Sequence, residues 1–424
     1  MKILVLSYSL SPDIGSEYAV GWNHIQTISQ DHEVTVIFGE TSGNFSNFDT
    51  RPLENHLQRH HYPNINFIPC KAKLNKFQEI ISRVISKIPH NGYKYKLWHF
   101  EASQIAKTLI LQQKIDVIQY LNPIGFKEPG YIWTLNAPYV WGPVQGVHVR
   151  PLSLLNPLPL SEKIGIISRN IFHLAALRFL PRVRKALRSA DVVIAATTKS
   201  QQQFKTYHNI QSLYLPENGV TNLVPVLVDK FSDPELQLVW IGRIDARKSL
   251  ITVFDSLRKI PNLKQIKLHV VGTGPLLDKL KTTSVKYGIN NQIVWHGQIP
   301  RDKVFDLLTR MHIHILTSNG EGNPTVIWEA MAMGIPTMAL DHCGMHDTIS
   351  KECGFLIPLS SYSKITDALA NKIIHIAENR NSLRSLSETT FKTAESHLLS
   401  TRRQFYNQVY SKALESYTAK RRTI

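Results

Sequence analysis

Short runs of apolar and β-branched residues recur along the first half of the chain, and each precedes a longer stretch with apolar positions at helical spacing. Five of these runs have the length of β-strands: residues 3–8, 33–38, 116–120, 139–141 and 191–195. Strands that alternate with helices pair in parallel, because a helix carries the chain back from the end of one strand to the start of the next. The first half therefore predicts a doubly wound α/β domain.

The same alternation starts again in the second half. Four further runs predict strands at residues 236–242, 267–272, 293–297 and 312–316. We therefore predict two doubly wound, Rossmann-like α/β domains that face each other across a cleft. The expected parts are an N-terminal domain at 1–215, a Pro- and Gly-rich linker at 216–234, a C-terminal domain at 235–395, and a C-terminal helix at 396–424 that returns to the first domain. In open parallel sheets the ligand binds beyond the carboxyl ends of the strands, so the loops at those ends are the candidate site.

The composition is that of an ordinary globular protein, with 43% hydrophobic and 19% charged residues. Cys70, Cys343 and Cys353 are too few for a disulfide framework, which favours a reducing, cytoplasmic compartment. No apolar run approaches the roughly 18 residues that a membrane-spanning helix needs. The apolar start at residues 3–6 is too short, and too soon interrupted by serines, to act as a signal peptide.

Two cations follow the first strand of the second domain. Arg243 and Lys248 lie in the loop that begins at Gly242, and Ser249 is placed to cap the next helix. A guanidinium and an ammonium beside a helix N-terminus suit a diphosphate. A solvated basic loop is the alternative at this point.

A second glycine-containing turn, Gly272 to Pro275, follows the next strand. Strand, Gly-x-Gly and helix is a turn that can approach phosphate, but the third glycine of a dinucleotide fingerprint is absent. A nicotinamide or flavin enzyme is therefore disfavoured. Tight packing of the strand on the helix explains the glycines equally well.

The most informative segment is 317–334, which follows a strand that we expect to be buried. We expect Asn323 to cap a helix, Pro324 to occupy its first position and Gly334 to end it. Glu321 then lies on the loop and Glu329 on the helix. Carboxylates accept hydrogen bonds from sugar hydroxyls, and helix N-termini bind phosphates.

Each glutamate alone is equally typical of a solvated acid, but the two together with Arg243 and Lys248 indicate a ligand site. The chain resembles the two-domain GT-B glycosyltransferases of family 4, retaining enzymes that use nucleotide-diphosphate sugars, over nearly its whole length. The resemblance rests on Gly-Arg-x4-Lys at 242–248, on Glu321 and Glu329 with seven residues between them, and on Pro-x-Asn-Gly at 216–219. Segments 11–22 and 141–146 resemble the bacterial branch that builds polysaccharides.

The resemblance implies a role for individual residues. The expected catalytic residues are Arg243 and Lys248, which would hold the donor diphosphate, and Glu321, which would face the transferred sugar. Glu329 would bind the nucleotide ribose. The expected donor-binding residues are Gly15, Gly242, Gly272, Asn323, Pro324, Thr325, Val326, Glu329 and Gly344. His148 is left open between contact with the sugar or acceptor and a surface or core position.

The resemblance also implies a mechanism and bears on whether the enzyme needs a metal or cofactor. As the bond between the sugar and phosphate lengthens, positioned cations stabilise the charge that grows on the diphosphate. No acid-rich metal loop is present, and His342, Cys343 and His346 lack the further ligands of a zinc site. We therefore expect no metal and no cofactor, with the nucleotide sugar as a substrate.

The net charge of +17 indicates an acidic partner or surface. Segments 71–114 and 162–205 each carry nine basic and two acidic residues, and each has apolar positions at helical spacing. Such helices can lie on an anionic membrane, or their apolar faces can complete the N-terminal core; the sequence leaves both open. The first alternative predicts peripheral binding to the inner face of the cytoplasmic membrane and a lipid-linked acceptor.

The predicted function is transfer of a sugar from a nucleotide-diphosphate donor to a glycan or lipid-linked acceptor in cell-surface polysaccharide biosynthesis. A sugar-nucleotide epimerase of the same fold is the main alternative, because it would bind the same donor but need no acceptor. A basic nucleic-acid-binding protein is disfavoured, since the sequence has no helix-turn-helix, zinc or RNA-recognition motif.

Overall fold

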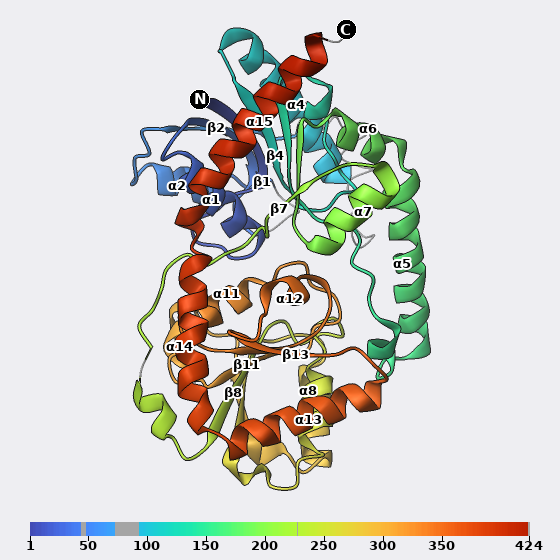
Figure 1. The fold of residues 1–424 in the computed structure, drawn as a ribbon, viewed down its shortest axis with the longest axis vertical. Helices are drawn as coiled ribbons and strands as arrows, with labels where there is room; N and C mark the ends of the chain where they lie inside the picture. Colours follow the sequence, from blue (N-terminus) through green and yellow to red (C-terminus); the bar gives the residue numbers. More distant parts are fainter. Residues whose placement is uncertain (44–47, 73–92, 227, 423–424) are drawn as a thin grey trace. The chain divides into compact units, whose positions relative to one another are not determined.

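The computed structural model describes residues 1–43, 48–72, 93–226 and 228–422. The chain divides into two compact units, which we call the N-terminal unit and the C-terminal unit (Figure 1). The N-terminal unit consists of Met1–Val147, Phe172–Glu217 and Leu399–Ile424. The C-terminal unit consists of His148–Ile171 and Asn218–Leu398.

The segment His148–Ile171 belongs to the C-terminal unit although it lies within the expected first domain, 1–215. Leu154 gives the physical reason, because it is 2% exposed and shares a hydrophobic core with Leu236 and Trp240 of the C-terminal unit. The order of strands and helices along a sequence cannot indicate that a segment of the first half packs in the core of the second unit.

The N-terminal unit is built on a parallel sheet of seven strands. In the order in which they pair, the strands are β3 (Ile65–Pro69), β2 (Glu33–Glu40), β1 (Lys2–Ser9), β4 (Val117–Asn122), β5 (Tyr139–Val144), β6 (Val192–Ala195) and β7 (Leu213–Tyr214). Ile3 pairs with Val34 of β2 on one side and with Val117 of β4 on the other. Central strands such as β1 are buried on both faces, which explains why they read as continuous apolar runs.

Helices connect these strands. They are α1 (Glu17–Ile28), α2 (Arg51–Leu57), α4 (Tyr93–Gln112), α5 (Leu160–Phe179), α6 (Pro181–Ser189), α7 (Thr198–His208) and the terminal α15 (Arg403–Arg422), with short 3-10 turns at η1 (Ile132–Thr134) and η2 (Leu152–Leu155). Helix α15, red in Figure 1, packs on the N-terminal unit, because Tyr406 and Tyr410 lie in the same core as Ile3. The Tyr410 hydroxyl donates a hydrogen bond of 2.6 Å to Gln119 Oε1 in β4.

The C-terminal unit is built on a parallel sheet of six strands. In pairing order they are β10 (Ile293–Gly297), β9 (Ile266–Val271), β8 (Leu236–Ile241), β11 (Ile313–Leu316), β12 (Thr337–Leu340) and β13 (Gly354–Ile357). Its helices are α8 (Leu250–Leu257), α9 (Leu277–Lys286), α10 (Arg301–Leu308), α11 (Thr325–Met331), α12 (Cys343–Thr348), α13 (Tyr362–Glu378) and α14 (Asn381–Ser396). Its 3-10 turns are η3 (Val228–Ser232), η4 (Leu263–Gln265) and η5 (Asn290–Gln292). The turn η6 (Leu399–Arg402), which follows α14, already belongs to the N-terminal unit. Both sheets place the loops that follow their strands at one edge, where ligands of such folds bind.

The predicted fold class, two doubly wound parallel-sheet domains, agrees with these two sheets. Strands β3, β7, β12 and β13 are additional to the predicted ones, and each is short or partly polar. Among the helices in the described ranges, none is both long and apolar enough to cross a lipid bilayer.

Candidate functional site

Glycines hold together the loops at the carboxyl ends of the C-terminal strands. A Cβ atom on Gly272, after β9, would stand 1.9 Å from the carbonyl oxygen of Gly242, after β8. A Cβ atom on Gly344 would stand 1.4 Å from the carbonyl oxygen of Gly322. Both positions therefore require glycine for the packing of one loop on another, whatever their contact with a ligand. The predicted Gly272 thus packs on the predicted Gly242, and the predicted Gly344 packs on Gly322, which was not predicted.

Backbone hydrogen bonds join the cationic loop to the glutamate loop. The Asn319 N–H donates to the Arg247 carbonyl at 2.8 Å, and the Asn319 side-chain amide donates to the Ala246 carbonyl at 3.0 Å. The Thr317 hydroxyl donates to the Ser249 carbonyl at 2.9 Å. Segments that lie about seventy residues apart in the sequence are therefore fixed side by side.

Glu321 is the centre of charge in this arrangement. Lys248 Nζ lies 2.8 Å from Glu321 Oε1, and the Arg247 guanidinium pairs with the same carboxylate oxygen. The side chains of Lys248 and Glu321 are only 13% and 12% exposed. Burial alone would raise the pKa of Glu321, but the charges of Lys248 and Arg247 outweigh it and lower that pKa. Glu321 is therefore an ionised carboxylate that positions two cations.

Among the ion pairs of the described residues, Glu321 pairs with Arg247 and Lys248, whereas Arg243 pairs with Asp245. The Arg243 side chain is 72% exposed, and its Nε lies 3.9 Å from Asp245 Oδ2. Arg247, which the sequence analysis passed over, occupies the place beside Glu321. Its position next to Lys248, in a loop already identified as cationic, was the available signal.

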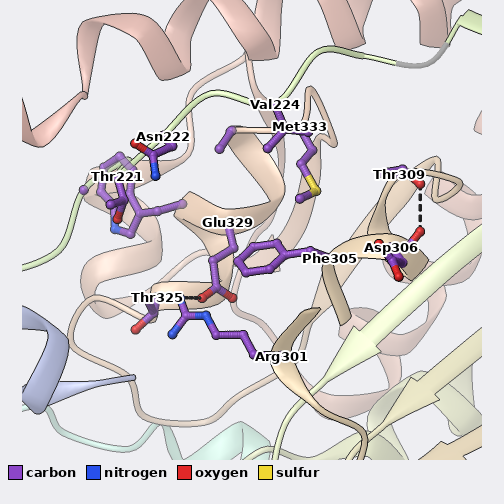
Figure 2. A pocket seen from close by; sticks show the side chains of 13 residues that line it. Thr221, Asn222, Val224, Arg301, Phe305, Asp306, Thr309, Thr325, Glu329 and Met333 are labelled. Atoms are coloured by element: carbon purple, nitrogen blue, oxygen red, sulfur yellow. Dashed lines mark hydrogen bonds and ion pairs between the residues drawn. The ribbon is translucent and has the colours of Figure 1, made fainter. Parts of the chain in front are cut away.

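Glu329 lies on α11 at the wall of a cavity of about 520 Å³. Arg301, the first residue of α10, points at it, with 2.6 Å between Arg301 Nη2 and Glu329 Oε1 (Figure 2). Burial raises the pKa of Glu329, and the nearby Arg301 charge offsets only part of that effect. Phe305 and Met333 give the same cavity an apolar side (Figure 2). A polar rim beside an apolar pocket is typical of sites for small organic ligands.

The helix starts differ from the predicted ones. Asn323 does not cap α11, because its Oδ1 accepts a hydrogen bond from the indole N–H of Trp328, and Pro324 takes the cap position instead of the first helical position. Thr325 lines the cavity, whereas Val326 is buried at 8% exposure. The backbone carbonyl of Asn323 accepts a 2.7 Å hydrogen bond from Asn218, so the predicted Pro-x-Asn-Gly segment supports the start of α11.

Two further capping predictions have different outcomes. Ser249 stands at the N-cap of α8 with left-handed backbone angles, but its side chain makes no capping hydrogen bond. Asp245 Oδ1 accepts a hydrogen bond of 2.9 Å from the Lys248 N–H in this loop. Gly334 lies just beyond α11 with φ of +62°, in agreement with the predicted end.

Gly15 and His148 are not part of these contacts. Gly15 is half-buried in the loop between β1 and α1 of the N-terminal unit, and His148 is half-buried at the start of the segment that joins the C-terminal unit. Their predicted contacts with donor and acceptor stay predictions. His342 Nε2 lies 2.9 Å from the Ser318 carbonyl, and His346 pairs with Asp341 at 2.6 Å, so these histidines are held by protein groups.

Residues 229–393 match the family model described as Glycosyl transferases group 1. Arg243, Lys248, Glu321 and Glu329 all lie inside this match. A lipopolysaccharide 1,6-galactosyltransferase of Salmonella typhimurium is 28% identical over 160 residues, which cover 36% of this chain and 43% of that protein. The chain spans about half of the length of the curated relatives that it matches. Residues 229–393 are therefore similar to glycosyltransferases, as the resemblance led us to expect.

Solved structures resemble the whole chain. Anabaena HepE, in complex with UDP, is 17% identical with a TM-score of 0.62, over 97% of this chain and 100% of that one. The lipopolysaccharide outer core galactosyltransferase WaaB, in its apo form, is 18% identical with a TM-score of 0.63 over the same shares. These similarities confirm the fold, two Rossmann-like domains of the GT-B type.

Proposed function

We propose that this chain is a retaining glycosyltransferase that moves a sugar from a nucleotide-diphosphate donor to a glycan or lipid-linked acceptor in cell-surface polysaccharide biosynthesis. The observation that carries the proposal is the convergence of Arg247, Lys248 and Glu321 on one edge of the C-terminal sheet, inside the segment that matches the glycosyltransferase family. The named relatives include a lipopolysaccharide galactosyltransferase, which supports the polysaccharide context.

In the proposed reaction, Lys248 and Arg243 bind the donor diphosphate. Lys248 is held in place by Glu321, while Arg243 is exposed and its ion pair with Asp245 is long, at 3.9 Å, so its side chain is available for the phosphates. As the anomeric bond lengthens, negative charge grows on the diphosphate, and these cations stabilise that charge more than they stabilise the ground state. Because cations neutralise the diphosphate, the proposal includes no metal and no cofactor.

Glu329 accepts hydrogen bonds from the ribose hydroxyls in this proposal. In the structure its carboxylate pairs with Arg301, whose side chain is 49% exposed, so the pair is open to solvent on one side. The Glu329 side chain itself is only 21% exposed, so a ribose would bind beside Arg301 and add hydrogen bonds to the carboxylate instead of replacing the ion pair.

The test is thermal unfolding of the full chain with UDP, GDP, ADP or CMP in the presence of EDTA. A ligand at about 100 times its dissociation constant stabilises the protein by roughly 2.7 kcal/mol. We expect one nucleotide to raise the midpoint of the wild type, and a much weaker response in Arg243→Ala and Glu329→Ala. If the nucleotide raised the midpoint of both variants as much as that of the wild type, the assigned donor site would be contradicted.

We also propose that the protein works as a peripheral enzyme at the inner face of the cytoplasmic membrane, and that α5 contacts that membrane. The two predicted basic segments have different outcomes, because residues 73–92 of the first lie outside the described residues. In the second, α6 buries its apolar side chains, including Val183 and Leu187, in the unit. Helix α5 buries Ile166 and Leu177 but leaves six large apolar side chains exposed: Leu160, Ile164, Ile167, Ile171, Phe172 and Phe179 are between 39% and 72% exposed.

The exposed positions 160, 164, 167 and 171 follow helical spacing, so they form one stripe along α5. Core packing does not account for this stripe, whereas a lipid surface does, and the surrounding basic residues suit anionic lipids. We expect the wild type to float with anionic liposomes at physiological salt, and Ile164→Asn/Ile171→Asn to float much less. Leu111→Asn is the control, because Leu111 is an exposed leucine on α4 outside the stripe. Absence of wild-type flotation removes the membrane proposal and leaves the transferase proposal intact.

A further inference from the structure

Three arginines from three segments lie close enough to repel one another, and two of them, Arg150 and Arg247, contact the Glu321 loop. Arg150 lies in the connection before α5, Arg169 on α5 and Arg247 in the loop after β8. The Cγ, Nε and Cδ atoms of Arg150 stand 3.4, 3.5 and 3.9 Å from the place of a Cβ atom on Gly320. Arg150 therefore packs against the residue that precedes Glu321.

The backbone of Arg150 is fixed by a single side chain. The Arg150 N–H donates to Asn170 Oδ1 at 3.2 Å, and Asn170 Nδ2 donates to the Arg150 carbonyl at 3.1 Å. Asn170 is buried at 7% exposure. This two-way hydrogen bonding fixes the start of the Arg150 side chain beside the loop, so its location does not depend on a mobile surface.

Positive charge in this group exceeds the negative charge that the protein supplies. Burial, followed by the like charges of Arg169 and Arg247, lowers the pKa of Arg150 to about 10, and the opposing effects of Asp245 and Glu321 are smaller. Burial and the Arg247 charge also lower the pKa of Arg169. Glu321 already pairs with Arg247 and Lys248. Within the described residues, Arg150 Nε is buried without a hydrogen-bond partner.

We propose that Arg150 and Arg169, with Arg247 beside them, bind a second anionic group of the substrates, a carboxylate or phosphate carried by the transferred sugar or by the acceptor sugar. The inference rests on the proposed function, which places the transferred sugar at Glu321 and the diphosphate at Arg243 and Lys248. Guanidinium groups match carboxylates and phosphates in two-pronged hydrogen bonds, and an anion would relieve the repulsion among the arginines.

The first experiment needs no knowledge of the nucleotide. Thermal unfolding of the full chain is followed with glucuronate, glucose 6-phosphate and glucose at equal concentration and ionic strength. We expect the acids to raise the midpoint of the wild type and glucose to leave it unchanged. In Arg150→Gln/Arg169→Gln we expect the apparent affinity for the acids to fall about tenfold or more, since charge-assisted hydrogen bonds are the strong ones.

Lys163→Gln is the matched control, because it removes one positive charge from α5 outside the group of arginines. Correct folding of the double variant is checked by its midpoint without ligand, which we expect to equal or exceed that of the wild type because repulsion is removed. Arg150→Lys keeps the positive charge but loses the two-pronged hydrogen bonding of the guanidinium. We expect its affinity for the acids to lie between those of the wild type and the double variant.

The second experiment separates the sources of the anion. UDP-glucuronate compared with UDP-glucose tests the donor sugar, and methyl β-glucuronide added with UDP tests the acceptor sugar. The inference would be overturned if the acidic sugars, with or without UDP, shifted the unfolding midpoint no more than glucose does. Loss of the nucleotide response in the double variant would also overturn it, because the arginines would then belong to the diphosphate site. If no nucleotide binds but the acids do, the proposed function fails and the anion site stands.

Discussion

Glu321 is the residue on which the candidate site depends most, because it holds Lys248 and Arg247 on one carboxylate oxygen. We predict that Glu321→Gln lowers the free energy of unfolding by about 1–3 kcal/mol, since a largely buried lysine loses its charged partner. Urea denaturation at pH 7 measures the change. Glu33→Gln, which breaks the exposed pair with Lys2, is the control and should have no measurable effect. Equal effects of the two substitutions would contradict a structural role for the Glu321 pair.

The buried carboxyl group of Glu217 leads us to predict that the stability of the protein depends on pH. Burial raises its pKa from the ordinary 4.5 to about 8, and the hydrogen bond from Gln145 Nε2 at 2.7 Å does not offset this. Between these two values the folded state binds a proton that the unfolded state has released. The free energy of unfolding contributed by this group therefore falls as pH rises from 4.5 to about 8.

Glu217→Gln removes that contribution. Relative to the wild type, the variant should gain stability steadily from pH 5 to pH 8, as measured by urea denaturation at several pH values. Glu388→Gln, at an exposed position, is the control. A constant difference between wild type and variant across this range would show that Glu217 is ionised throughout.

At single residues, the sequence predicted chemistry better than it predicted contacts. Lys248 and Glu321 were identified by type and spacing, and the structure brings them within 2.8 Å. Asn323 was assigned a cap because its type favours one, yet the Trp328 indole, one helical turn further on, takes its side-chain oxygen. Arg301 could not be paired with Glu329 from the sequence, because the two residues come from different helices.

At the scale of elements, apolar runs identified most strands, including the edge strand β10, and missed β3, β7, β12 and β13. Strands β3 and β7 lie at the two edges of their sheet, where one side lacks a partner strand and polar residues are tolerated. Strand β12 has only four residues, Thr337–Leu340, which is too short for a period to be read. The helical pattern of α5 was found, but which of its faces is covered depends on the packing of the rest of the chain.

Helix α15 supports a prediction at this scale. Tyr410 is fully buried in the N-terminal core and bonded to Gln119 of β4. We predict that Tyr410→Ala lowers the free energy of unfolding by about 3–5 kcal/mol, the usual cost of truncating a buried aromatic side chain. Tyr417→Ala, nearer the end of the same helix and bonded to Asn136 at the surface, should cost far less. Similar costs for both would mean that α15 is not anchored through its buried face.

At the scale of the whole molecule, alternation of strands and helices predicted two parallel-sheet domains, and the sheets of seven and six strands agree with it. The segment His148–Ile171 did not follow that logic, since it leaves the first unit and contributes Leu154 to the core of the second. The same segment carries Arg150, so part of the cationic surface beside Glu321 could not be found by reading the second domain alone. Sequence order identifies domains, but contacts between distant segments decide which residues share a site.

The charge of the whole molecule leads to the prediction that sugar transfer is independent of divalent metal. The net charge is +17, and the loops at the edge of the C-terminal sheet contribute Arg243, Arg247 and Lys248 within six residues. Fixed cations of this kind perform the charge stabilisation that a metal ion provides in other phosphate-binding sites. We therefore expect the rate of transfer in EDTA to stay within about twofold of the rate with added Mg²⁺ or Mn²⁺. Lys248→Met is the informative variant, because it should lose activity that no added metal restores. Loss of wild-type activity on chelation, with recovery on addition of a metal, would place the stabilising charge on a metal ion instead of on these side chains.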